Sequence, residues 1–191
     1  MLALVMTLAM LLPGSAAAGA PHVLFHAAPD GRSLRGLDAV YVAVRCSAPY
    51  ERPYGLSEAG LRSEVELVLN ANGIRTLRRP EWRETSGRPY LSVNVVGNTL
   101  NAQLNDTTFF YTLTLELVQQ VQLHRTPALL CDGVTWSEGT TIVLPRDRLR
   151  TVAEQVGTLA ADFSQAVMEA NAGRGGTRRG KGPQNASLMS K

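Results

Sequence analysis

Residues 109 to 124, FFYTLTLELVQQVQLH, constrain the fold of this chain more than any other stretch. Apolar side chains occupy the odd positions from Phe109 to Leu123, with Gln119 as the one interruption, and most even positions are polar. Because side chains on a β-strand alternate between two faces, this pattern predicts a long strand with one face in the core and the other in solvent. Sixteen paired residues would span about 50 Å, so we expect a bulge or bend near Gln119 and Gln120.

Four other segments carry strand patterns. In residues 39–45, Val40, Val42 and Val44 alternate with less apolar residues. Residues 133–144 are a natural antiparallel partner for the long strand. The predicted strands are residues 39–45, 74–77, 90–96, 109–124 and 133–144. The last two together predict a long hairpin.

Two segments have the spacing of amphipathic helices. In the first, Ser57 is a suitable N-cap, and Leu61, Val65 and Val68 then follow at helical intervals. The second extends from 145 to 171 with an apolar stripe at steps of three and four. We therefore predict an α+β fold, a two-layer sandwich with two helices on one face of a mostly antiparallel four- to five-stranded sheet.

The chain ends differ from its centre. The chain has 191 residues, 45% of them hydrophobic and 18% charged, which is typical of one globular domain with extensions. An apolar run of eleven residues, followed by a Pro-Gly break and small residues, predicts a signal peptide and is shorter than the ~20 residues that span a bilayer. We expect a signal peptide at 1–18, a flexible segment at 19–37, the α+β domain at 38–171 and a disordered basic tail at 172–191. The mature chain is then periplasmic or secreted, without a transmembrane segment.

The net charge of +3 does not indicate a nucleic-acid partner. Five of the 19 basic residues lie after Asn171, so the rest of the chain holds 14 basic and 16 acidic residues. A near-neutral domain, a Gly-rich tail without aromatic residues and the predicted export all argue against nucleic acid.

The sequence contains two cysteines, Cys46 after the first predicted strand and Cys131 before the last. Export would place them in an oxidising compartment, where disulfides form and persist. We predict a Cys46–Cys131 disulfide, which would stabilise the fold by roughly 4.5 kcal/mol in the loop-entropy model. Two separately buried thiols are the alternative.

No catalytic, cofactor or metal motif stands out. His124 lies close to Cys131 in sequence, so a thiol-dependent enzyme that uses Cys131 and His124 is one alternative function. The histidines of HVLFH have no third ligand nearby and no helix signal, so we predict neither a metal site nor a cofactor.

Two surfaces are candidate binding sites for a partner. The first is the low-charge even face of the long strand, with Tyr90 and two other aromatic side chains as possible anchors. Its predicted contact residues are Phe110, Thr112, Thr114, Gln120, Gln122 and Trp136.

The second surface is the loop RRPEWRETSGR, which could form an anion or glycan platform because arginine binds carboxylate or phosphate and stacks on aromatic rings. Its residues would be Arg78, Arg79, Trp82 and Arg83. A solvated loop in which Trp82 caps the core is the alternative.

Several runs carry a resemblance: GLSEAGLRSEVELVLNANGIRTL, GRPYLSVNV, FFYTLTLELVQQVQL and TWSEG before a final helix. In this order the chain resembles small exported bacterial proteins whose function is not known. It is also similar in element order to the lipopolysaccharide-assembly lipoprotein and to the N-terminal domain of the Tol-Pal translocation protein. It departs from the former by lacking a cysteine for acylation after the signal peptide, and from the latter by lacking propeller repeats.

These observations predict an exported, non-catalytic cell-envelope protein that binds a protein, lipid or glycan partner. A structural or self-associating envelope component is the alternative, because exposed strand edges promote association. The sequence does not fix the oligomeric state.

Overall fold

A computed structural model describes five parts of the chain, residues 23–26, 31–47, 56–99, 108–145 and 148–172. The predicted signal peptide and all of the predicted basic tail after Ala172 lie outside the described residues. Both therefore stay predictions.

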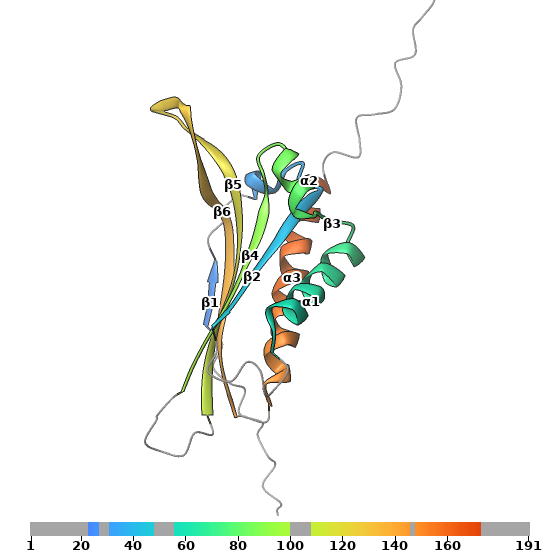
Figure 1. The fold of residues 1–191 in the computed structure, drawn as a ribbon, viewed down its shortest axis with the longest axis vertical. Coiled ribbons are helices and arrows are strands. Elements are labelled where there is room, and N and C mark those ends of the chain that lie inside the picture. Colours follow the sequence, from blue (N-terminus) through green and yellow to red (C-terminus); the bar gives the residue numbers. More distant parts are fainter. Residues whose placement is uncertain (1–22, 27–30, 48–55, 100–107, 146–147, 173–191) are drawn as a thin grey trace, which may run out of the picture.

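The described residues form strands, helices and one 3-10 helix around a single sheet (Figure 1). In chain order these elements are β1 (Val23–His26), η1 (Arg32–Leu34), β2 (Ala39–Ser47), α1 (Glu58–Ala71), β3 (Arg75–Thr76), α2 (Arg79–Glu84), β4 (Tyr90–Thr99), β5 (Thr108–Leu123), β6 (Thr126–Pro145) and α3 (Arg150–Asn171). The strand order in the sheet is β1-β6-β5-β4-β2-β3.

The sheet is mixed. The pairs β1–β6, β6–β5 and β5–β4 are antiparallel, whereas β2 runs parallel to both β4 and β3. The predicted long hairpin is the β5–β6 pair, and β6 begins seven residues earlier than the predicted residue 133. The sheet has six strands rather than four to five, because β1 forms an edge strand within the segment predicted to be flexible.

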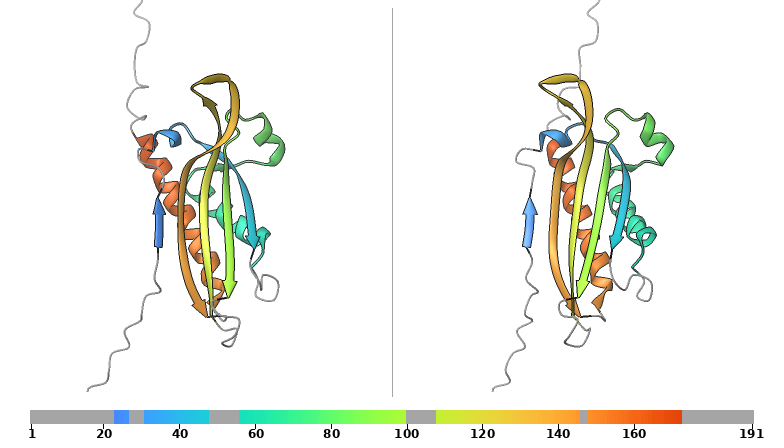
Figure 2. Two further views of the ribbon diagram at one scale, coloured as in Figure 1. Left: turned by 90° about the vertical axis from the view of Figure 1, so that its left-hand side faces the viewer. Right: turned by 60° about the vertical axis from the view of Figure 1, so that its left-hand side comes forward.

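Both long helices pack on the same face of the sheet (Figure 2), which confirms the α+β class and the position of the helix layer. The apolar stripe of α3 meets the odd face of β5, α1 packs on α3 and β2, and all of these residues belong to one buried core. Its largest fully buried side chains include Tyr111, Phe109, Phe163, Leu34, Leu61, Leu69, Leu91, Leu113, Leu115 and Leu117. None of the helices in the described part of the chain is long and apolar enough to cross a bilayer.

The ends of α1 have the expected local chemistry. The Ser57 hydroxyl accepts a hydrogen bond from the Gly60 amide at 3.0 Å, which satisfies one of the unpaired amides in the first turn. After the helix, Gly73 takes a left-handed conformation with a φ of 81°, and Ile74 then turns back into the core.

Two features differ from the sequence prediction. The segment read as a polar loop contains α2, because Pro80 stands in its first turn, where proline favours a helix start. The irregularities of the β5–β6 pair fall between Leu117 and Val118 and between Gln122 and Leu123, on either side of the expected bulge at Gln119 and Gln120.

Candidate functional site

The face of the sheet opposite α1 and α3 is the candidate site. Strand alternation and register bring side chains from four strands into rows across this open face. One row joins Tyr41, Tyr90, Val118 and Val134, the next joins Ala43, Ser92, Glu116 and Ser137, and the third joins Arg45, Asn94, Thr114 and Gly139. Neither long helix covers these rows (Figure 2).

The open face has a hollow at the end of the sheet where β5 and β6 extend beyond β4. The hollow has a volume of about 380 Å³. Its polar lining consists of Arg45, Ser92, Asn94, Glu116 and Asp132, and Tyr90 forms an aromatic wall. One guanidinium, two carboxylates, an amide and a hydroxyl can together donate and accept hydrogen bonds in a small area. This arrangement suits recognition of a polar ligand.

Helix α2 closes one end of the open face with Trp82. The Trp82 ring centroid lies 5.6 Å from that of Tyr41 and 5.9 Å from that of Tyr90, and its indole nitrogen donates to the Arg88 carbonyl at 2.8 Å. Aromatic pairs at these separations stabilise an orientation beyond simple burial. Trp82 therefore packs on the open face rather than on the core, and it holds Tyr90 beside the hollow.

The turn after α2 connects this aromatic cluster to β5. Gly87 and Arg88 both have positive φ values, 72° and 41°, a conformation that is uncommon for a residue other than glycine. Their carbonyls accept hydrogen bonds from Gln120 N, at 2.8 Å, and from Trp82. The left-handed turn thus fixes both the aromatic wall and the point where β5 leaves the sheet.

The residues predicted for partner binding divide between two faces. Phe110, Thr112 and Thr114 are half-buried on the open face, as expected. Gln120 lies beyond the paired end of β4, opposite Asp132.

Gln122 and Trp136 have other environments. The Gln122 side-chain amide donates to the Pro127 carbonyl inside the hairpin. Trp136 lies on the helix-covered face, only 6% exposed, with its ring 4.9 Å from that of Phe163. A partner on the open face therefore does not reach Trp136.

The predicted arginine platform is exposed, but it is not built around Trp82. Arg78, Arg79 and Arg83 are all exposed on or beside α2, whereas Trp82 is half-buried against the two tyrosines. Glu81 accepts from the Arg78 amide at 2.8 Å and lies 3.9 Å from the Arg75 guanidinium. A local carboxylate thus offsets part of the positive charge, and anion binding at this surface stays a prediction.

The predicted Cys46–Cys131 disulfide is wrong. The structure contains no bond between the two sulfurs, and the register explains why. Cys46 pairs with Val95, which pairs with Leu113, whereas Cys131 pairs with Val121. Eight residues of β5 separate these levels, about 26 Å at the usual rise, and a disulfide requires Cα atoms within about 7 Å.

The structure gives the thiol-dependent alternative no geometric support. The Cys131 sulfur contacts the Val121 carbonyl at 3.9 Å, whereas His124 is exposed in the hairpin turn. A base must reach its nucleophile at about 3 Å to activate it, and no such contact joins these two side chains in the described hairpin. Within the described residues, no group of three or more His, Cys, Asp or Glu side chains could hold a metal ion.

The sequence analysis missed Arg45, Asn94 and Asp132. Its strand patterns already placed Arg45 and Asn94 on the polar sides of their strands. Their proximity depends on β2 lying next to β4, which is a parallel pairing that no local pattern reveals.

Comparison with known proteins gives structural similarities of low score. No protein-family model matches the chain, and no curated protein matches it. Two structures of PelC dodecamers from Paraburkholderia phytofirmans align with 22% and 18% identity and TM-scores of 0.46 and 0.45. Each alignment covers 77% of this chain, and 98% and 97% of the respective PelC chains.

The rare lipoprotein B from Shewanella oneidensis aligns with 12% identity and a TM-score of 0.29, over 70% of this chain and 95% of its own. At these identities and scores, neither similarity assigns a function to this chain. The candidate site is therefore interpreted from its own geometry.

Proposed function

We propose that this chain is an exported, non-catalytic cell-envelope protein that binds a partner through the open face of its sheet. The observation that carries the proposal is the 380 Å³ hollow lined by Arg45, Asn94, Glu116 and Asp132. Concave surfaces with a few convergent polar groups are the usual form of ligand sites.

The lining favours a protein or glycan partner over a lipid chain. Most groups in the hollow donate or accept hydrogen bonds, and the apolar contribution is limited to Ala43, Val118, Val134 and the Tyr90 ring. Burying these polar groups against an acyl chain would leave them without partners, at a cost of about 1–3 kcal/mol each. Hydroxyl, amide or peptide groups on the partner would replace the lost water.

Export is part of the proposal and rests on the leader-like sequence at residues 1–18. We expect the mature chain in the periplasm or in the medium. Cell fractionation with an antibody against the folded domain, together with N-terminal sequencing of the mature chain, measures both its location and its cleavage. Uncleaved protein in the cytoplasm would contradict export and leave the binding proposal to its own test.

The binding proposal is tested by photo-crosslinking in intact cell envelopes. A photoreactive residue replaces Asn94 in the hollow, and a matched variant carries it at Leu67, which is exposed on α1 on the other side of the molecule. We expect a discrete adduct with the Asn94 variant and none with the Leu67 variant. Equal labelling from both positions, or no adduct from a folded and exported Asn94 variant, would overturn the proposal.

A further inference from the structure

The end of the β5–β6 hairpin forms an arm that extends beyond the rest of the sheet. The last β4 pair is Tyr90 with Val118, and after it β5 and β6 pair only with each other. Figures 1 and 2 show this arm projecting past the other strands and bending away from the helices. We define the outer edge of the arm as Thr126–Val134 of β6.

The hydrogen-bond pattern shows which backbone groups face this outer edge. Gln120 N donates to Gly87 O, so the Gln120 amide points away from β6. Directly opposite residues of an antiparallel pair either exchange both backbone hydrogen bonds or exchange none. In a pair that exchanges none, the amide and carbonyl of both residues point away from the other strand. Asp132, opposite Gln120, therefore directs its amide and carbonyl outward, and the same parity applies to Leu130 and Val134.

No described strand occupies the outer edge. β1 pairs with β6 only from Glu138 to Thr141, and the Ser33 hydroxyl donates to the Thr135 carbonyl at 2.8 Å. From Val134 to Leu130, the outward amides and carbonyls meet no partner among the described residues. Such an edge is a ready template for another strand.

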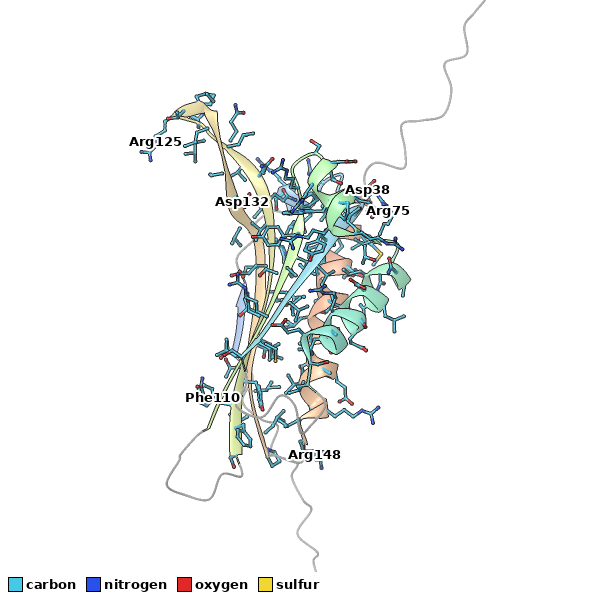
Figure 3. The ribbon with its side chains drawn as sticks, viewed as in Figure 1. Asp38, Arg75, Phe110, Arg125, Asp132 and Arg148 are labelled. Carbon is cyan, nitrogen blue, oxygen red and sulfur yellow. The ribbon has the colours of Figure 1, made fainter. Side chains whose placement is uncertain are left out.

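Three large apolar side chains of this edge are exposed. Leu130 and Val134 are 58% and 55% exposed on the open side of the arm, and Leu129 is 51% exposed on the other. Asp132 lies between Leu130 and Val134 and is the one charged residue from Thr126 to Val134. Figure 3 labels Asp132 on the arm and Arg125 in the hairpin turn just beyond the edge. Large apolar side chains beside unpaired backbone groups are characteristic of strand-addition sites.

We propose that the outer edge of the arm binds an extended segment of another protein, which adds to β6 as a further strand. The segment carries apolar residues opposite Leu130 and Val134 and a Lys or Arg opposite Asp132. Cross-strand apolar pairs and an opposite-charge pair would then stabilise the same register.

A second copy of the chain fits this edge less well. Because Asp132 is the one charged residue of the edge, pairing two copies of the edge places Asp132 opposite itself or an uncharged residue. Like charges directly opposite each other destabilise a strand pair. The charge pattern therefore selects a different protein that supplies the cation.

The test uses the full chain and two capped synthetic peptides, TVTKTVT and TVTETVT, added to isotope-labelled protein and followed by amide NMR shifts. We expect the lysine peptide to shift the amides of Leu130, Asp132 and Val134 and to bind about tenfold more tightly than the glutamate peptide. The Asp132→Lys variant should reverse this preference. A lysine peptide with methylated backbone nitrogens should lose binding, because strand addition requires main-chain hydrogen bonds.

Control variants separate this edge from the hollow, which shares Asp132 and Val134. Asn94→Ala changes the hollow alone and should leave peptide affinity unchanged, so failure here and failure of the crosslinking test are distinct results. Peptide binding that ignores the charge at Asp132 or survives backbone methylation would overturn the proposal, as would no binding by either peptide. Concentration-dependent dimerisation abolished by Asp132→Lys would also overturn it and identify a second copy as the occupant.

Discussion

The two halves of β5 have the same alternating pattern but different environments. From Phe109 to Leu117, every odd side chain is fully buried under the helix layer. In the arm, Val121 and Leu123 continue the pattern, yet both remain partly exposed because no helix covers them. The comparison shows that alternation sets which way a side chain points, whereas a second layer decides whether that side is a core or a surface.

The largest expected difference between the halves is the cost of a lost leucine side chain. Leu115→Ala should reduce the free energy of unfolding by about 2–5 kcal/mol, because it leaves a cavity in a closely packed core. The matched Leu130→Ala change in the arm should alter it by less than about 0.5 kcal/mol. Urea unfolding followed by circular dichroism measures both values, and similar losses would mean that the arm is part of the cooperative core.

Glycine-to-alanine changes in the two halves should differ in their effect on the free energy of unfolding, by less than the leucine changes do. A Cβ at Gly139 would lie 2.8 Å from the Leu113 backbone oxygen, so Gly139→Ala should destabilise the fold by about 1–3 kcal/mol. A Cβ at Gly133 would meet the Val121 side chain at 2.9 Å, and on the uncovered arm that side chain can move away. We expect a clearly lower urea midpoint for Gly139→Ala than for Gly133→Ala, and the reverse order would contradict this account.

Local periodicity predicted the parts of the fold that depend on neighbouring residues. The buried odd face of β5, the start of α1 at Ser57 and the stripe of α3 all follow from spacing along one element. The parity of β6 does not, because an extra residue at Thr135 shifts its side chains relative to β5. Trp136 therefore lies in the core, although the sequence analysis assigned it to the binding surface.

The sequence predicted only those residues of the candidate site that lie on a single strand. Phe110, Thr112 and Thr114 follow from the pattern of β5 alone. The hollow also needs Arg45, two strands away, and that neighbourhood is set by the sheet order β6-β5-β4-β2. The incorrect disulfide has the same cause, since positions at strand ends say nothing about register across the sheet.

The smallest expected effect concerns Tyr111, which buries a hydroxyl in the covered half of β5. Its oxygen is buried without a hydrogen-bond partner, and burial, followed by the electrostatic influence of Cys46, raises the Tyr111 pKa above its ordinary value of 10.0. Because the hydroxyl is buried without a hydrogen-bond partner, Tyr111→Phe removes an unsatisfied polar group and should raise the free energy of unfolding at pH 7 by about 1 kcal/mol.

At high pH, Tyr111 should lower the free energy of unfolding. Tyr111 releases its proton near pH 10 in the unfolded chain and only at higher pH in the folded one. The folded state therefore loses stability relative to the unfolded state as pH rises above 10. Urea unfolding at pH 7, 9.5 and 11 should show Tyr111→Phe gaining further on the natural chain only at the highest pH. A constant difference across all three values would mean that the phenol reaches water in the folded protein, so that the helix layer does not seal the covered half of β5 at this position.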